Sequence, residues 1–202
     1  MERETAFFRV AKRVQSPSMK VLALVGTVAP QRRLVSAIRW LLSSAFPLEA
    51  ARQQLIDLSE KGLGLWNGGS VGRFKENSTS IVKSVLGSDA LIIGCPVYDA
   101  SVPEGLKNLL HHLPVEAVAA KPIGIVVMDG RQQHVQSVEW QLRNMLAWRG
   151  AFLVPASVRL TAADFATGLP GDEVKRDLAK LADSIIKLAQ VVPRRAGLIE
   201  SR

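Results

Sequence analysis

The first segment with residues suited to ligand chemistry runs from Thr27 to Arg33. Thr27 supplies a hydroxyl, and Arg32 and Arg33 supply guanidinium donors at the predicted start of a helix, where free N–H groups attract phosphate. Two interpretations stay open for the arginines, phosphate binding and simple solvation. The segment lacks both Gly-x-x-x-x-Gly-Lys-Ser/Thr and Gly-x-Gly-x-x-Gly, which argues against a triphosphate-hydrolysing site and an ordinary dinucleotide site.

Two further segments suit the binding of a flat ring. Pro96-Val97-Tyr98 follows a strongly apolar run, and a loop beside a strand end can hold a ring with main-chain groups while limiting the access of water. Asp129-Gly130-Arg131 has a glycine, where backbone can approach a ligand closely, between two polar side chains. A plain polar turn is the alternative interpretation of this third segment.

Metal and hydrolase chemistry are not indicated. His111 and His112 are neighbours on a predicted helix and therefore point to different faces, without the i, i+4 geometry of a metal-binding pair. No Gly-x-Ser-x-Gly elbow and no pair of catalytic carboxylates is visible. We therefore expect no metal and no acid–base catalytic residue.

Apolar runs predict five strands that alternate with helices. The strands are expected at Val21 to Val25, Gln54 to Leu58, Ala90 to Gly94, Ile123 to Met128 and Phe152 to Val154. Helices are expected after Pro30, over Phe74 to Leu86, from Pro103 to Leu113, over Val135 to Trp148 and from Asp172. This alternation predicts parallel strands, right-handed crossovers and a three-layer α/β sandwich. The polar flanks of the second strand favour an edge position.

Five strands with helices on both faces fit the sheet order 2-1-3-4-5. The switch point of this order lies between the first and third strands, and ligands of such sheets bind outside the carboxyl ends of the strands. The three polar segments follow the first, third and fourth strands. We therefore expect them to meet at one site.

Length and composition indicate a single domain with one well-filled core. The chain has 202 residues, of which 48% are hydrophobic and 22% charged, and no apolar run approaches the roughly 20 residues of a membrane helix. Of the net charge of +8, residues 1–18 and residues 193–202 each contribute +2, which leaves +4 spread over the rest. Because no basic run is present, nucleic acid is not an expected partner, and because no apolar run is long enough, a membrane is not one either.

The basic ends set the expected domain limits. Residues 1–18 are predicted to be a flexible basic extension, 19–192 the functional domain and 193–202 a basic tail. A single cysteine, Cys95, excludes an internal disulfide framework and a cysteine-based zinc site, and it suits a reducing cytoplasm. We expect Cys95 to be a packed, half-buried thiol.

Two motifs of the chain resemble those of a known family. The run Asp89 to Tyr98 followed by Gly105-Leu106-Lys107-Asn108-Leu109-Leu110 resembles the NADPH-dependent FMN reductase family, and within it the flavin reductases of two-component alkanesulfonate monooxygenase systems. Lys121-Pro122 before the fourth strand and Gly130 after it are further matches. The resemblance implies a flavodoxin-like domain over about Met19 to Val192.

The resemblance also implies an activity and its cofactors. The chain is expected to transfer a hydride from NADPH, or NADH, to FMN, and reduced flavin could pass to a partner monooxygenase. Pro96, Val97 and Tyr98 would contact the isoalloxazine and ribityl groups, and Gly130 with its neighbours would line the other edge of the ring. Hydride passes between cofactors, so the protein orients them and no acid–base triad is needed.

The first polar segment departs from the family pattern. Where the family has Gly-Ser-x-Arg and several serines, this chain has Gly26-Thr27-Val28-Ala29-Pro30-Gln31-Arg32-Arg33, with a single hydroxyl. Three outcomes stay open: the arginines replace the lost donors, FMN binds weakly as a substrate, or flavin binding is lost. The alternatives to a flavin reductase are thus a non-enzymatic flavodoxin-like interaction module and an FMN-bound quinone, azo or nitro reductase.

The helix Val135 to Trp148 has two apolar faces. One carries Val138 and Leu142, and the other carries Trp140, Asn144 and Trp148 at i, i+4 and i+8. Aromatic residues are enriched at the centres of protein contacts, and the resembled reductases are dimers or tetramers built through this region. We therefore expect a homodimer or homotetramer through this helix. The alternative is that the tryptophans cover the edge of the monomer core.

Overall fold

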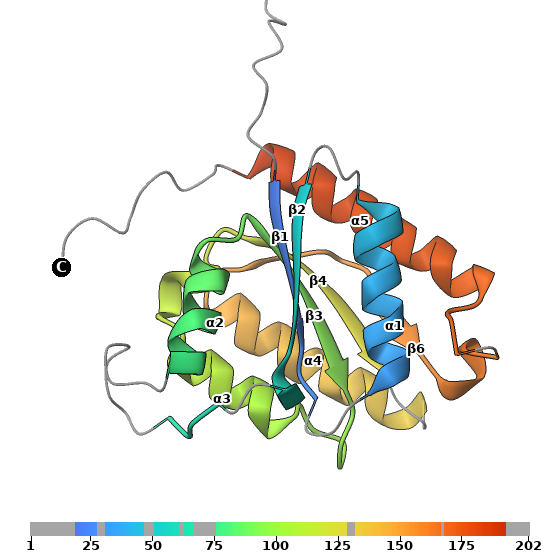
Figure 1. Cartoon of the computed structure of the whole chain (residues 1–202), viewed down its shortest axis with the longest axis horizontal. Coiled ribbons are helices and arrows are strands. Elements are labelled where there is room, and N and C mark those ends of the chain that lie inside the picture. Colours follow the sequence, from blue (N-terminus) through green and yellow to red (C-terminus); the bar gives the residue numbers. More distant parts are fainter. Residues whose placement is uncertain are drawn as a thin grey trace, which may run out of the picture.

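The predicted strands form one parallel sheet. The computed structural model describes residues 19–27, 31–46, 51–60, 63–66, 76–128, 132–166 and 168–192. In this part of the chain the strand order is β2-β1-β3-β4-β5, with β6 also paired to β4, and every pairing is parallel (Figure 1). The strands are β1 Met19–Val25, β2 Ala51–Asp57, β3 Ala90–Pro96, β4 Pro122–Met128, β5 Phe152–Leu153 and β6 Val158–Leu160. The predicted order 2-1-3-4-5 is confirmed.

The edge strand β2 begins earlier and ends earlier than the apolar pattern predicts. It pairs with β1 along its whole length, from Met19 opposite Ala51 to Val25 opposite Asp57. Leu58, the last residue of the predicted strand, belongs instead to the 3₁₀ helix Leu58–Glu60. Backbone pairing with β1 thus extends the strand through polar residues that local hydrophobicity leaves out. The predicted edge position of this strand is confirmed.

The fifth strand is split into two pieces. β5 pairs with the start of β4, from Pro122 opposite Phe152, and β6 pairs with its end, from Val126 opposite Val158. Pro155 lies between the pieces and has no N–H to donate to a sheet ladder. A prediction of one strand near Phe152 to Val154 therefore finds β5 and misses β6.

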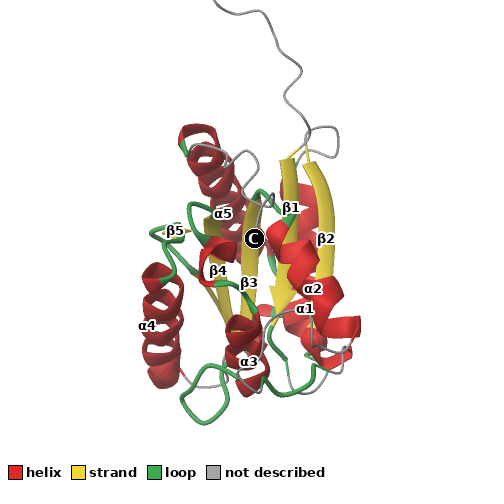
Figure 2. Cartoon of the chain, turned by 90° about the vertical axis from the view of Figure 1, so that its left-hand side faces the viewer, coloured by secondary structure: helices red, strands yellow, loops and turns green. Residues whose placement is uncertain are grey.

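Helices cover both faces of the sheet and bury two apolar clusters. One face carries α1 Arg32–Trp40, which continues as a π-helix over Leu41–Ala45, and α5 Asp172–Val191. The other face carries α2 Glu76–Leu86, α3 Glu104–His112 and α4 Gln132–Trp148. Short 3₁₀ helices occur at Val115–Val118 and Ala162–Asp164. The predicted three-layer sandwich is visible in Figure 1, and Figure 2 shows α4 at the side of the molecule near β5.

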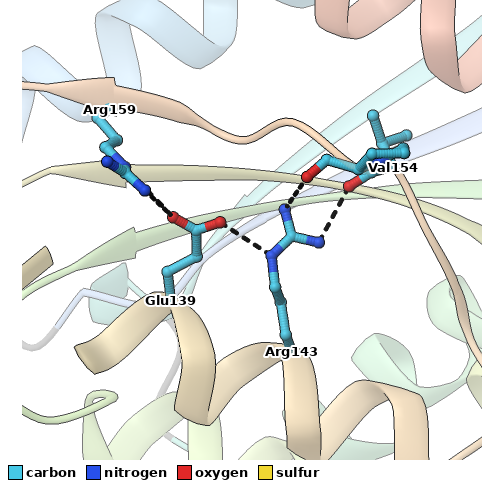
Figure 3. A network of polar contacts seen from close by, with 5 residues as sticks. Glu139, Arg143, Val154 and Arg159 are labelled. Atoms are coloured by element: carbon cyan, nitrogen blue, oxygen red, sulfur yellow. Dashed lines mark hydrogen bonds and ion pairs between the residues drawn. The ribbon is translucent and has the colours of Figure 1, made fainter. Parts of the chain in front are cut away.

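A polar network fixes α4 against the broken fifth strand (Figure 3). Glu139 on α4 accepts from Arg143 Nε at 2.8 Å and from Arg159 Nη2 on β6 at 3.1 Å. The guanidinium of Arg143 also donates to the carbonyl oxygens of Val154 at 3.0 Å and Pro155 at 2.9 Å. These bonds satisfy carbonyls in the gap between β5 and β6, where the sheet ladder is interrupted.

Candidate functional site

The ends of β1, β3 and β4 are joined by backbone hydrogen bonds that bring the following loops together. Gly26 N–H donates to Gly94 C=O at 2.8 Å, and Val97 N–H donates to Met128 C=O at 2.9 Å. A Cβ on Gly26 would lie 3.0 Å from the Cβ of Leu106, so a larger residue would push α3 away from the first loop. The first two predicted segments therefore meet at one end of the sheet. Asp129, Gly130 and Arg131 lie outside the described residues.

Thr27 is buried, with 2% of its surface exposed, and its hydroxyl donates to Asp57 at the end of β2. The same carboxylate oxygen of Asp57 accepts from Ser59 N–H at 3.0 Å and from Ser59 Oγ at 2.9 Å. A hydroxyl has one proton, so Thr27 cannot donate to a phosphate while it donates to Asp57. Asp57 is not among the predicted site residues, and its only signal in the sequence is an acidic residue that follows the apolar pair Leu55-Ile56.

Arg32 and Arg33 lie in the first turn of α1 and are both exposed. The residue before this helix, Gln31, makes no side-chain cap, and the first turn has no acidic residue. Within the part of the chain that the structure describes, Gln31 thus gives the N–H groups at this helix end no side-chain acceptor of the kind that usually satisfies them. An uncapped helix N-terminus with two arginines is suited to an anion such as a phosphate monoester.

Tyr98 connects the first two loops. Gln31 Nε2 donates to Tyr98 Oη at 3.0 Å, which ties the start of α1 to the loop after β3. Tyr98 and Ser101 then form a β-bridge around a turn in which Asp99 and Ala100 have φ of 47° and 54°. Aspartate tolerates left-handed backbone, but alanine at the second position is strained there, and such strain is concentrated at functional sites.

The cysteine near the end of β3 lies inside the core. Burial raises the pKa of the Cys95 thiol to about 12, although the charge of Lys107 acts in the opposite direction. Cys95 is completely buried, so the prediction of a half-buried thiol is wrong. The predicted run places its side chain inward because both faces of β3 are covered by helices.

The two adjacent histidines point to different faces, as expected. His112 is buried and its Nε2 lies 2.8 Å from Gly64 O, while the ring of His111 stacks on Trp66 with centroids 5.3 Å apart. In the described part of the chain, no group of three or more His, Cys, Asp or Glu residues is arranged to hold a metal ion. Nor does any helix in that part have the length and apolarity needed to cross a membrane.

The tryptophan face of α4 is open in the single chain. Trp140 and Trp148 are 60% and 74% exposed, whereas Val138, Leu142 and Leu146 on the opposite face are buried. The two tryptophans therefore do not cover the edge of the monomer core, which was the alternative to an interface. Arg149 lies over the Trp148 ring, with its guanidinium carbon 5.9 Å from the ring centroid.

Comparisons with known proteins identify the family of this chain. Residues 19–165 match the model of the family described as "NADPH-dependent FMN reductase". An "NAD(P)H-dependent FAD/FMN reductase" from Geobacillus thermodenitrificans is 26% identical, over 84% of this chain and 93% of its own. The "NADH-dependent FMN reductase SfnF" from Pseudomonas fluorescens is 30% identical, over 75% of this chain and 81% of its own. An "FMN-dependent NADPH-azoreductase" from Staphylococcus aureus is 26% identical, over 79% of this chain and 86% of its own.

Solved structures share the fold. The flavoenzyme NAD(P)H:(acceptor) oxidoreductase FerB from Paracoccus denitrificans superposes with a TM-score of 0.69 at 18% identity, over 85% of this chain and 97% of its own. The apo form of an NADH:FMN oxidoreductase (EMOB) superposes with a TM-score of 0.66 at 20% identity, over 88% of this chain and 91% of its own. Flavodoxin 1 from Bacillus cereus, at 12% identity and a TM-score of 0.56, has the same flavodoxin-like fold. The chain belongs to the NADPH-dependent FMN reductase family and is an oxidoreductase that uses FMN and NAD(P)H.

Proposed function

We propose that FMN binds across the carboxyl ends of β1, β3 and β4, with its phosphate at the start of α1 and its ring against Pro96-Val97-Tyr98. The observation that carries this placement is the uncapped N-terminus of α1, linked to Tyr98 by the 3.0 Å bond from Gln31. A phosphate at one end and a flat ring at the other require two such adjacent loops. FMN held there would supply the acceptor for a hydride from the nicotinamide.

The chain's own groups divide between these two ends. Arg32, Arg33 and the N–H groups of the first turn of α1 bind the phosphate, while Thr27 orients the loop through Asp57. At the ring end, the Val97 N–H is already bonded to Met128 O, so Val97 contributes its side chain and carbonyl. We assign Asp129, Gly130 and Arg131 to the other edge of the ring on the family resemblance.

We propose that the flavin exchanges with solvent and is reduced as a substrate. The first loop has a single hydroxyl, which donates to Asp57, and its two arginines are exposed side chains. This set of donors supports weaker phosphate binding than a loop rich in free serine hydroxyls. Reduced FMN that leaves the protein can supply a flavin-dependent monooxygenase, which we propose as the partner.

A resident flavin that passes electrons to a second acceptor is the other candidate. It is supported by the relative named an FMN-dependent NADPH-azoreductase, and quinones, azo dyes and nitro compounds are the acceptor classes to test. The two candidates differ in the amount of flavin needed for turnover. A resident cofactor supports azo-dye reduction at one FMN per chain, whereas a flavin substrate requires FMN in excess.

The experiment that tests the function is an FMN titration followed by NADPH and NADH oxidation with and without added FMN. Micromolar binding and flavin-dependent turnover are expected. The Arg32→Ala, Arg33→Ala double variant should bind FMN at least tenfold more weakly, with riboflavin affinity unchanged, because riboflavin lacks the phosphate. An equal loss of affinity for FMN and riboflavin would contradict the phosphate assignment. Unchanged FMN affinity in Gly130→Trp would contradict the ring assignment.

We also propose a homodimer or homotetramer through the exposed Trp140 and Trp148 face of α4. Sedimentation of Trp140→Ala, Trp148→Ala should give a smaller species than the wild type, while Lys180→Ala on the outer face of α5 should not.

We place the reaction in the cytoplasm, where NAD(P)H is available. Residues 19–192 are proposed to be sufficient for FMN reduction, which a truncated chain tests directly.

A further inference from the structure

The turn that carries Tyr98 has a conformation that Ala100 disfavours. Asp99 and Ala100 both lie in the left-handed region, and the turn is closed by Ser101 N–H donating to Tyr98 C=O at 2.9 Å. Turns with two left-handed residues favour Asn-Gly, because a Cβ at the second position is unfavourable. The surrounding structure must therefore stabilise the left-handed backbone at Ala100.

Lys107 of the Gly-Leu-Lys-Asn motif makes the shortest described side-chain contact with this turn. Its ammonium group donates to Ser101 Oγ at 2.7 Å, and both side chains are partly buried. Charge-assisted hydrogen bonds are shorter and stronger than neutral ones, more so when water is partly excluded. This bond holds Ser101, the residue that follows Ala100.

Contacts from two other elements to the turn are longer. Gln31, at the start of α1, donates to Tyr98 Oη at 3.0 Å. Gln141 on α4 donates to Ala100 C=O and accepts from Val102 N–H, each at 3.5 Å, the outer limit for a hydrogen bond. Among these contacts, Lys107 is the one charged donor.

We propose that Lys107 is a positioning residue that locks the Tyr98–Ser101 turn through Ser101 and so sets the orientation of Tyr98 before any ligand binds. The consequence for flavin affinity rests on the proposed function, which places the ring against this loop. Lys107 also affects the end of β3 electrostatically: burial raises the pKa of Cys95, and the charge of Lys107 opposes that rise.

The composition of the chain provides a direct probe. Tyr98 is the only tyrosine, so incorporation of 3-fluorotyrosine gives a single ¹⁹F signal that reports on this turn in flavin-free protein. The wild type should give one sharp resonance. Lys107→Met and Ser101→Ala remove the same bond from its two ends, so both should shift or broaden that resonance. Lys107→Arg keeps a cationic donor and should restore it. Lys83→Met, an exposed lysine of α2, is the matched control and should leave it unchanged.

FMN affinity is the second measurement. Lys107→Met and Ser101→Ala should each raise the Kd for FMN about tenfold, the scale of one charge-assisted hydrogen bond, while Lys107→Arg stays within about threefold. A wild-type resonance and Kd in both Lys107→Met and Ser101→Ala would overturn the proposal, and so would an effect of Lys107→Met that Ser101→Ala does not share. If wild-type protein binds no FMN, the proposed function fails, and the flavin-free ¹⁹F spectra still decide whether Lys107 locks the turn.

Discussion

Thr27→Val is the substitution that most directly tests the first loop. Valine has nearly the same shape as threonine, so the change removes the hydrogen bond to Asp57 without opening a cavity in this buried position. A hydrogen bond to a charged group contributes about 1.5–3 kcal/mol, and a buried acceptor that loses its donor also loses solvation. Asp57 keeps both hydrogen bonds from Ser59, so we expect the free energy of unfolding to fall by about 2 kcal/mol, toward the lower end of this range.

That loss is measurable by thermal and urea unfolding followed by circular dichroism. In a chain of this length about 2 kcal/mol lowers Tm by roughly 4–8 °C. The matched control is Thr27→Ser, which keeps the hydroxyl and should stay within about 1 kcal/mol of the wild type. The reasoning is refuted if Thr27→Val is as stable as the wild type, or if Thr27→Ser is destabilised as much as Thr27→Val.

Three titratable groups give further predictions. Burial alone would raise the pKa of Glu139, but hydrogen bonds that include those from Arg143 and Arg159 hold it below its usual value. The contribution of the Glu139 carboxylate to the free energy of unfolding is fully present above about pH 4.3 and is lost as the pH falls through the lowered pKa. The difference in stability between the wild type and Glu139→Gln should therefore shrink in acid. With its pKa raised by burial to about 12, Cys95 should resist a thiol reagent at about pH 8 and react only in urea. Burial lowers the pKa of Lys121 to about 8 in the folded chain, whereas a free lysine has a pKa of about 10.4. Between these two pH values the unfolded chain binds more protons than the folded chain, so the free energy of unfolding rises with pH. Urea unfolding of Lys121→Met should lack that rise.

Much of the fold is predictable because its signals are local. The run Ala90 to Gly94 is apolar enough to indicate a strand covered on both faces, and Leu106, Leu109 and Leu110 recur at the spacing of one helix face. Every one of those leucines is buried in the structure. The alternation of such runs with helices then leaves few possible topologies, because parallel strands need right-handed crossovers.

Other features depend on residues far apart in the chain. Thr27 and Asp57 are 30 residues apart, and no pattern in either segment indicates that they form a pair. The start of β2 follows its register with β1, and β6 is too short to show a period of its own. Local hydrophobicity carries no information about these pairings.

The sequence by itself determined the three polar segments, the strands that they follow and the family motif, because residue type and periodicity are properties of the chain alone. Only the tertiary structure decided which donors of the site are already engaged. It pairs the Thr27 hydroxyl with Asp57 and places the Lys107 ammonium on Ser101, while the start of α1 has no side-chain cap. Each of these depends on side chains brought together by the packing of helices on the sheet, so the geometry exists only after the chain has folded.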